Sequence, residues 1–342
     1  TTVTPTNGQK GTFSTWVRVD KVGAQKIMIN YSDSTNYSYI RFHPSKFLQC
    51  YATLSDSVVN NYKTERFFLD FNGWYHIVVR IDTTQATATD RLRLYVNGEL
   101  QTAYDTQTYS GSQNAQHPIL IASATNNHRI GADEGPADYF NGLMSHFHFC
   151  DGYSYDASAF GSTDATTGEW KINTSPSVTY GTNGFFILKD GNSVTDQSGN
   201  SNNFTVGGGT LTKTEDCPDN VFATINSLVP SDIASLSNGN TTLRQSDQAS
   251  AIATLGFQGG KYYWEVKNSN QQSYTQIVGV LRQARMEASG NDGYNVGTND
   301  GSWGYFMQSN QDNGKSFHNN SLGSVYQTTS ANDILQVAVD GT

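Results

Sequence analysis

The feature that most constrains this chain is an alternation of apolar and polar residues, broken by turn residues, in two regions far apart. One is GWYHIVVRIDTTQATATDRLRLYVNGELQ at residues 73–101, and the other begins with GGKYYWEVKN at residues 259–268. A period of two places alternate side chains on opposite faces of a β-strand. The pair Asn97-Gly98 tolerates the positive φ angles of a tight hairpin turn. Both regions therefore predict antiparallel strands, and no helical period extends beyond about three turns.

Composition supports an all-β protein and bounds its size. The chain has 342 residues, which suffices for two domains. Aromatic residues make up 12%, so tyrosine and phenylalanine supply much of the expected core. Charged residues are only 15%, and Asn, Gln, Ser, Thr and Gly take their place, which suits strands and turns better than long helices. We predict two tandem antiparallel β-sandwiches joined by a loop-rich connector.

The charge distribution argues against nucleic acid and membranes as partners. The 21 Lys and Arg residues are scattered and the formal net charge is −9, whereas a phosphate-binding groove needs clustered basic residues. An acidic surface also repels acidic polymers, except where a cation bridges the contact. No apolar run approaches the length of a membrane span, and no signal peptide is visible.

The cysteines are Cys50, Cys150 and Cys217, an odd number that leaves at least one thiol free or paired between chains. Their spacing matches neither a disulfide framework nor a zinc site. We expect structural thiols in a protein assembled in a reducing cytoplasm.

Five short patterns occur in a fixed order in the first part of the chain. They are TFSTWV at 12–17, GWYHIVV at 73–79, LYVNGE at 94–99, RIG at 129–131 and YFNGLMS at 139–145. In this order they resemble the laminin-G-like, concanavalin A-type lectin domains, which include the pentraxin relatives. The resemblance implies a lectin-like jelly roll over residues 1–152.

The last part of the chain resembles another sandwich family. GGKYYWEVKN is followed by IVGVL at 277–281, GSWGYF at 301–306 and NDILQVAVDGT at 332–342. This order resembles the SPRY domain and implies a second sandwich over residues 229–342. SPRY domains continue with further strands beyond this point, so we expect this one to be incomplete at its C-terminus and the natural protein to run on.

Residues 153–228 are rich in Gly, Asn and Ser, and we predict a connector with short strands there. A collinear set of residues resembles the connector of structural proteins from tailed marine phages: Asp151, Gly152, Asp156, Phe160, Gly161, Asp164, Thr182, Asn183, Gly184, Phe185, Asp196, Ser198, Gly199, Asn200, Asn202 and Asn203. The resemblance implies a virion structural protein, such as a head fibre, a decoration protein or a tail-fibre component. Its place would be the virion surface, after assembly in the host cytoplasm.

Two loops carry enough oxygen ligands to suggest calcium. Asp133, Glu134 and Asp138 lie in GADEGPADY, and relatives of lectin-like sandwiches often use calcium in or near such a loop. DQSGNSNN, which begins at Asp196, is a second oxygen-rich turn. A solvated acidic loop and an ordinary tight turn are the commoner origins of these patterns. Calcium is therefore the one cofactor that the sequence suggests.

Aromatic side chains beside polar ones can stack on sugar rings. Tyr139 and Asp138, beside the acidic loop, and Trp303 and Tyr305, on a predicted strand, are the candidate glycan-binding residues. The alternative for Trp303 and Tyr305 is burial in a core.

His146 and His148 lie two apart on a predicted strand, so both side chains point to one face. They could form half of a metal site or a solvent-facing polar row.

Catalysis is not expected. Glucanases of this fold class need two facing carboxylates, and none of the seven glutamates lies in the E-x-D-x-E pattern that places acids on one strand face. We predict a binding protein whose partners are other virion proteins and host surface polysaccharide, and which forms a homo-oligomer. A purely architectural virion protein, a bacterial cell-surface adhesin and a glycan hydrolase are the alternatives.

Overall fold

In the computed structural model, the chain folds into two compact units. The described residues are 4–20, 23–68, 73–120, 127–134, 139–166, 168–189, 193–209, 211–214, 216–226, 235–237, 240–244, 251–257, 260–269, 275–282, 296–297, 301–308 and 312–340. The first unit comprises residues 1–222 and 237–242, and the second comprises residues 223–236 and 243–342.

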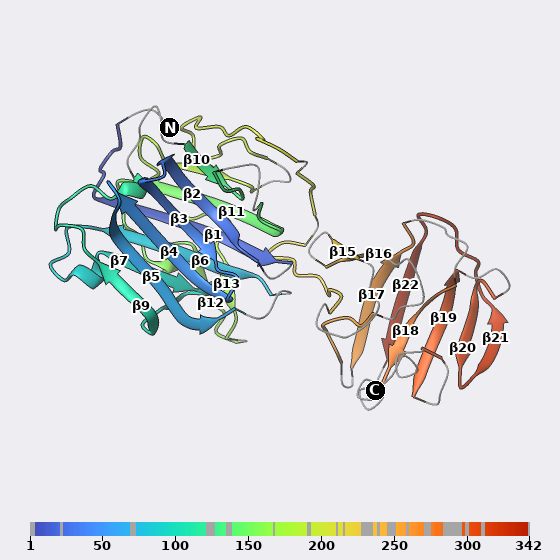
Figure 1. Ribbon diagram of the computed structural model, residues 1–342. Helices are drawn as coiled ribbons and strands as arrows, with labels where there is room; N and C mark the ends of the chain where they lie inside the picture. The colour runs from blue at the N-terminus through green and yellow to red at the C-terminus, as the bar shows by residue number, and fades with distance from the viewer. Residues whose placement is uncertain are drawn as a thin grey trace. The chain divides into compact units, whose positions relative to one another are not determined.

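Two six-stranded sheets form the sandwich of the first unit (Figure 1). The first sheet has the order β14 (Phe185–Ile187), β11 (Gly142–Asp151), β1 (Lys10–Val19), β6 (Tyr75–Asp82), β7 (Leu92–Val96) and β8 (Glu99–Leu100). The second sheet has the order β10 (Asn127–Ile130), β2 (Gln25–Asp33), β3 (Asn36–Phe42), β4 (Phe47–Leu54), β5 (Ser57–Phe67) and β9 (Tyr104–Tyr109). Every ladder described between these strands is antiparallel.

The main core lies between the two sheets. Phe13 and Val17 of β1 contribute from the first sheet, and Ile40, Leu48 and Tyr62 contribute from the second. These positions alternate along their strands with residues that face away from the core, as the period of two predicts. Asn97 and Gly98 have φ angles of 49° and 82°, so the predicted hairpin turn between β7 and β8 is confirmed.

The all-β fold class with a lectin-like jelly roll is confirmed. The described helical segments are three short 3₁₀ turns, at Ala88–Asp90, Pro118–Leu120 and Ala157–Ala159. None of the helical segments in the described ranges has the length and apolar character needed to cross a membrane.

The segment after residue 152 packs on the outer face of the first sheet. Phe160 and Ala157 join Val78, Tyr95 and Cys150 in a second, smaller core on that face. The strands β12 (Gly161–Thr163) and β13 (Trp170–Ile172) form a hairpin, and β14 extends the first sheet beyond β11. The expected connector therefore contributes strands and buried side chains to the first unit, because both faces of that sheet carry apolar residues.

Three small sheets follow β14 along the chain, and the ladders described in two of them are antiparallel. Strands β15 (Ser235–Ser237) and β16 (Thr242–Arg244) form one sheet, and β17 (Lys261–Lys267) and β22 (Ile334–Asp340) form another. The third contains β18 (Gln276–Leu281), β19 (Ser302–Gln308), β20 (Lys315–His318) and β21 (Ser321–Val325). The predicted strands at 259–268, 277–281, 301–306 and 332–342 all have described counterparts, and the SPRY resemblance stays a prediction.

Candidate functional site

The acidic loop predicted to hold calcium is partly engaged by basic residues. The Asp133 carboxylate lies 2.9 Å from Lys26 Nζ, and it also accepts the backbone N–H of Glu134. Arg129 donates to the backbone carbonyls of Asp133 and Glu134. Asp138 lies outside the described residues. Within the described ranges, no three His, Cys, Asp or Glu side chains come close enough together to hold a metal ion, and calcium binding stays a prediction.

The predicted sugar-stacking residues are divided between the two units. Tyr139 belongs to the first unit and its side chain is half exposed. Trp303 and Tyr305 lie on β19 of the second unit, where Trp303 is exposed and stacks on His318 with ring centroids 4.6 Å apart. Tyr305 donates its hydroxyl hydrogen to the Gln327 carbonyl. Their roles in glycan binding stay predictions.

The expectation that His146 and His148 form a solvent-facing row is wrong. Both side chains are buried, because the segment after residue 152 covers this face of the first sheet. The His148 ring stacks on Phe186 at 3.9 Å, and its Nδ1 lies 2.9 Å from the Tyr180 hydroxyl. Burial holds the pKa of His148 well below its usual value, so the ring is neutral at pH 7.

The oxygen-rich turn at Asp196 acts as a structural clamp. Its carboxylate accepts the backbone N–H groups of Phe186, Ser198 and Asn202, at 2.8, 2.9 and 2.9 Å. The Asn200 and Asn202 amides in turn donate to backbone carbonyls of residues 181–184. Residues 182–185 and the turn at 196–203 are therefore halves of one hydrogen-bonded unit that holds β14 in the sheet.

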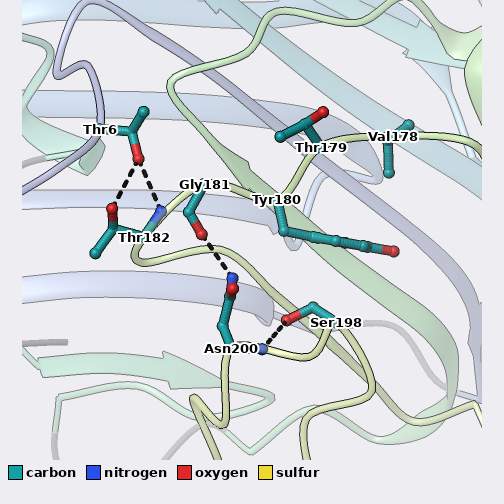
Figure 2. A pocket seen from close by; sticks show the side chains of 8 residues that line it. All are labelled: Thr6, Val178, Thr179, Tyr180, Gly181, Thr182, Ser198 and Asn200. Carbon is teal, nitrogen blue, oxygen red and sulfur yellow. Dashed lines mark hydrogen bonds between the residues drawn. The ribbon is translucent and has the colours of Figure 1, made fainter.

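A shallow hollow of about 600 Å³ lies beside this clamp, between the N-terminal segment and the loops at 178–182 and 198–200. Figure 2 shows its lining, in which polar groups bond to one another. Thr6 Oγ1 accepts the Thr182 N–H at 2.7 Å, and Asn200 Nδ2 donates to the Gly181 carbonyl at 2.6 Å. Because these groups are already paired, the hollow offers a ligand few polar partners.

A cluster of tyrosines occupies the outer face of the second sheet. Tyr31 of β2, Tyr37 and Tyr39 of β3, and Tyr51 of β4 have ring centroids 5.3–6.5 Å apart in each contacting pair. We call these four residues the tyrosine face. Tyr39 is buried among them, whereas the other three rings are half-buried. They point away from the core because Ile40 and Cys50, their neighbours along the strands, point into it.

A row of long polar side chains crosses the same face next to the tyrosines. The strand register pairs Lys26 with Arg41, Arg41 with Gln49, and Gln49 with Lys63. We call these four residues the basic row. Lys26 Nζ and Arg41 Cζ each lie over the Tyr39 ring, at 4.5 and 4.6 Å from its centroid. Burial raises the pKa of Tyr39 to about 12, so its ring stays neutral between these cations.

A chain of hydrogen bonds holds the centre of the basic row. Arg41 Nε and Nη2 both donate to Gln49 Oε1, at 3.0 and 2.9 Å, and Gln49 Nε2 donates to Asn61 Oδ1 at 2.9 Å. Lys63 Nζ pairs with Asp105 at 2.6 Å. These bonds fix the orientation of polar and charged groups around half-buried aromatic rings.

Sequence reasoning missed this surface, although part of its signal was visible. In NYSYIRF, residues 36–42, the period of two places Tyr37, Tyr39 and Arg41 on one face. Nothing in the sequence shows that Tyr31 on β2 lies opposite Tyr37, or that Tyr51 on β4 lies opposite Tyr39. That arrangement depends on the register of β2, β3 and β4.

Residues 1–154 match the family model described as the concanavalin A-like lectin/glucanases superfamily. A comparison with curated proteins found no match.

Several solved structures are similar to this chain at low sequence identity. A heptameric SAP-like pentraxin from Limulus polyphemus is 14% identical with a TM-score of 0.36, over 56% of this chain and 83% of that one. Domain 4 of the GH43 extracellular arabinanase AbnA from Geobacillus stearothermophilus, in complex with arabinotriose, is 14% identical with a TM-score of 0.30, over 44% and 71%. Domains LG4-5 of the mouse laminin α1 chain are 7% identical with a TM-score of 0.29, over 53% and 40%. Strands β1–β11 of the jelly roll therefore lie within residues 1–154, which match the concanavalin A-like lectin/glucanase family model.

Proposed function

We propose that the first unit is a glycan-binding module and that the tyrosine face is its binding site. The observation that carries the proposal is the cluster of Tyr31, Tyr37 and Tyr51 rings, half-buried on the outer face of the second sheet. Sugar rings have apolar C–H faces that pack against aromatic rings, while their hydroxyls need hydrogen-bond partners. Arg41 supplies donors next to the rings, and Asn61, whose oxygen accepts from Gln49, directs its amide NH₂ group elsewhere as a further donor.

Binding without hydrolysis is part of this proposal, because the family match includes both lectins and glucanases. The described glutamates, which are Glu65, Glu99, Glu134, Glu169 and Glu265, are all exposed. A general acid of glycoside hydrolysis needs a carboxyl group whose pKa is raised by an apolar environment. The surface positions of these glutamates favour a lectin over a hydrolase.

We also propose that the protein is a structural component of a phage particle, a head fibre, a decoration protein or a tail-fibre component, on the virion surface. The support is the resemblance of residues 151–203 to phage connectors, and the clamp at Asp196 explains why those residue types occur together. Many copies on one particle would raise the effective concentration, so weak single-site binding would suffice for attachment to host polysaccharide. A bacterial cell-surface adhesin is the alternative setting.

The glycan-binding proposal is tested on an array of neutral and acidic bacterial polysaccharides with the fluorescently labelled protein. Saturable binding is expected, and the double variant Tyr37→Ala/Tyr51→Ala is expected to lose it. Tyr153→Ala is the matched control, because Tyr153 is an exposed tyrosine of the segment that packs on the other sheet. Absence of binding to every polysaccharide, or equal binding by the double variant, contradicts the proposal.

Repeating the array with EDTA tests calcium separately. Loss of binding on chelation would support a calcium site at Asp133, Glu134 and Asp138. Unchanged binding would leave the tyrosine face as the whole site.

For the virion setting, antibodies against this protein should label purified phage particles in electron micrographs, and labelling of bacterial cell envelopes alone would favour the adhesin.

A further inference from the structure

We infer that the tyrosine face selects acidic polysaccharides, and that the Arg41 guanidinium recognises a carboxylate of the sugar chain. This inference rests on the proposed glycan-binding function and adds the class of glycan. It follows from the charges and hydrogen bonds of the basic row.

The cations of the basic row differ in whether a carboxylate already neutralises them. Lys26 pairs with Asp133 at one end of the row, and Lys63 pairs with Asp105 at the other. Arg41 lies between them, and its partners within the described part of the chain are the Gln49 amide oxygen and the Tyr39 ring. The centre of the row therefore carries a positive charge without a carboxylate partner from the described residues.

The geometry of Arg41 leaves donors for a ligand. A guanidinium has five N–H donors in a planar fork, and Gln49 accepts one from Nε and one from Nη2. The Nη1 pair and the second Nη2 hydrogen remain, which form the edge that binds a carboxylate through two parallel bonds. Because the guanidinium is held against Tyr39 and Gln49, little side-chain entropy is lost when a ligand binds.

The hydrogen-bond chain also determines which end of the Asn61 amide faces Gln49. Gln49 accepts from Arg41 through its oxygen, so its nitrogen must donate to Asn61 Oδ1. Asn61 is then left with its NH₂ group for a ligand. The face thus presents donors from both Arg41 and Asn61, and a ligand rich in acceptor oxygens complements it better than a neutral one.

The net charge of −9 does not oppose this selection. The Debye length is about 10 Å at 0.1 M salt, so charges elsewhere on the surface are largely screened. The groups next to the ligand decide the interaction. There Arg41 lies between Lys26 and Lys63, and each of these lysines is paired with one carboxylate.

The test compares binding of the full chain to polygalacturonate, which carries a carboxylate on every sugar, with binding to its carboxyl-reduced, neutral form. Isothermal titration at 0.1 M salt is expected to show an affinity at least about tenfold higher for the acidic polymer. One charge-assisted bidentate contact changes the affinity by about this factor. Arg41→Gln is expected to abolish the preference. Arg93→Gln is the matched control, because Arg93 lies on β7 of the other sheet and pairs with Asp90, and it should keep the preference. Far-ultraviolet circular dichroism and thermal unfolding confirm that the variants fold.

Arg41→Lys separates the effect of the planar guanidinium from the effect of its charge. Lysine keeps the positive charge but cannot form two parallel hydrogen bonds to a carboxylate. A preference intermediate between wild type and Arg41→Gln supports the inference. Equal binding of both polymers by the wild type overturns the inference and leaves the proposed glycan binding intact. An acidic preference that persists in Arg41→Gln also overturns it. Binding to neither polymer and to no polysaccharide of the array removes the proposed function and this inference together.

Discussion

Arg18 on β1 and Asp216, 198 residues further along the chain, form an ion pair from which solvent is almost completely excluded. Arg18 lies on the outer face of the first sheet, next to Trp16 on the same face of β1. The Trp74 indole N–H donates to the other oxygen of Asp216 at 3.1 Å. The pair therefore ties the end of the segment that covers the first sheet to the sheet itself.

Removal of Asp216 should destabilise the first unit strongly. Asp216→Ala leaves the buried Arg18 guanidinium without its counter-ion, and breaking a buried pair in this way costs about 3–5 kcal/mol. Hydrogen exchange of peptides from β1 and β6, followed across a urea series by mass spectrometry, measures the loss within the first unit. The double variant Arg18→Met/Asp216→Leu removes both charges and should recover the part of the loss that comes from the unpaired guanidinium, while the Trp74 indole N–H still loses its acceptor. A loss under about 1 kcal/mol in the single variant would show that the pair is hydrated.

Stability of the first unit should fall as the pH is lowered below about 6.5. Burial lowers the pKa of His76 and of His117 to about 3, while the unfolded chain protonates histidine near pH 6.5. The folded state therefore binds fewer protons, and the stabilisation present above pH 6.5 is lost on acidification, by up to about 1.4 kcal/mol per pH unit for each histidine. Urea midpoints at pH 7.5 and pH 5 measure the effect.

The contacts of His76 fix its neutral tautomer. Its Nδ1 accepts the Trp170 indole N–H at 3.0 Å, so its Nε2 carries the hydrogen that points to Ser14 Oγ at 2.9 Å. His117→Gln should remove the contribution of one histidine to the pH dependence, while the other buried histidines, His76, His128 and His148, maintain the rest. Equal midpoints of the wild type at the two pH values would contradict this account.

The clamp at Asp196 should control the local stability of β14. Asp196→Ala removes the acceptor for three backbone N–H groups, and each unsatisfied partner costs up to about 1–3 kcal/mol where water cannot replace it. Hydrogen exchange of residues 181–187 should accelerate by at least about tenfold, with smaller changes in β6. Asp196→Asn retains one acceptor oxygen and should give an intermediate rate. Unchanged exchange in both variants would mean that packing of Phe185 alone holds the strand.

Release of Lys63 from its acidic partner should strengthen binding of acidic glycans. Asp105 is exposed and lies 2.6 Å from Lys63. Asp105→Asn adds one unpaired cation to the edge of the basic row, so affinity for polygalacturonate should rise by about three- to tenfold at low salt and by less at 0.5 M salt. Asp312→Asn, which frees Lys315 of the second unit, is the control and should change nothing. An equal gain in that control would assign the effect to net charge.

Thiol reactivity should separate the cysteines. Cys50 and Cys150 are buried, and burial raises the pKa of each to about 12. Cys217 is half-exposed, and its pKa is raised less, by partial burial and by the carboxylate of Asp219. Ellman's reagent should modify one thiol in the native protein and three after unfolding, because the thiolate is the reacting form. Cys217→Ser should show no native reaction, and a fast reaction there would contradict the burial of the other two.

Much of the fold could be predicted from local pattern. The strands around Phe13 and Ile77 have the period of two, and Asn97-Gly98 forms the expected turn. The order of five such patterns along the chain resembles that of lectin-like domains, and this resemblance predicted the jelly roll. Local pattern failed at His146 and His148, where alternation predicted an outward face but could not show that residues 153–222 cover it.

The candidate site was predictable only in part, for the same reason. The sequence by itself determined which side chains share a strand face, such as Tyr37, Tyr39 and Arg41, because strand geometry repeats every two residues. Tertiary structure alone decided that the outer face of the first sheet is buried, that the tyrosines of the second sheet stay half-open, and that Arg41 lies between two neutralised lysines. Those features depend on contacts between residues far apart in the sequence, as between Arg18 and Asp216. Such contacts form only after the strands have paired in register and the sheets have packed, and no local periodicity encodes them.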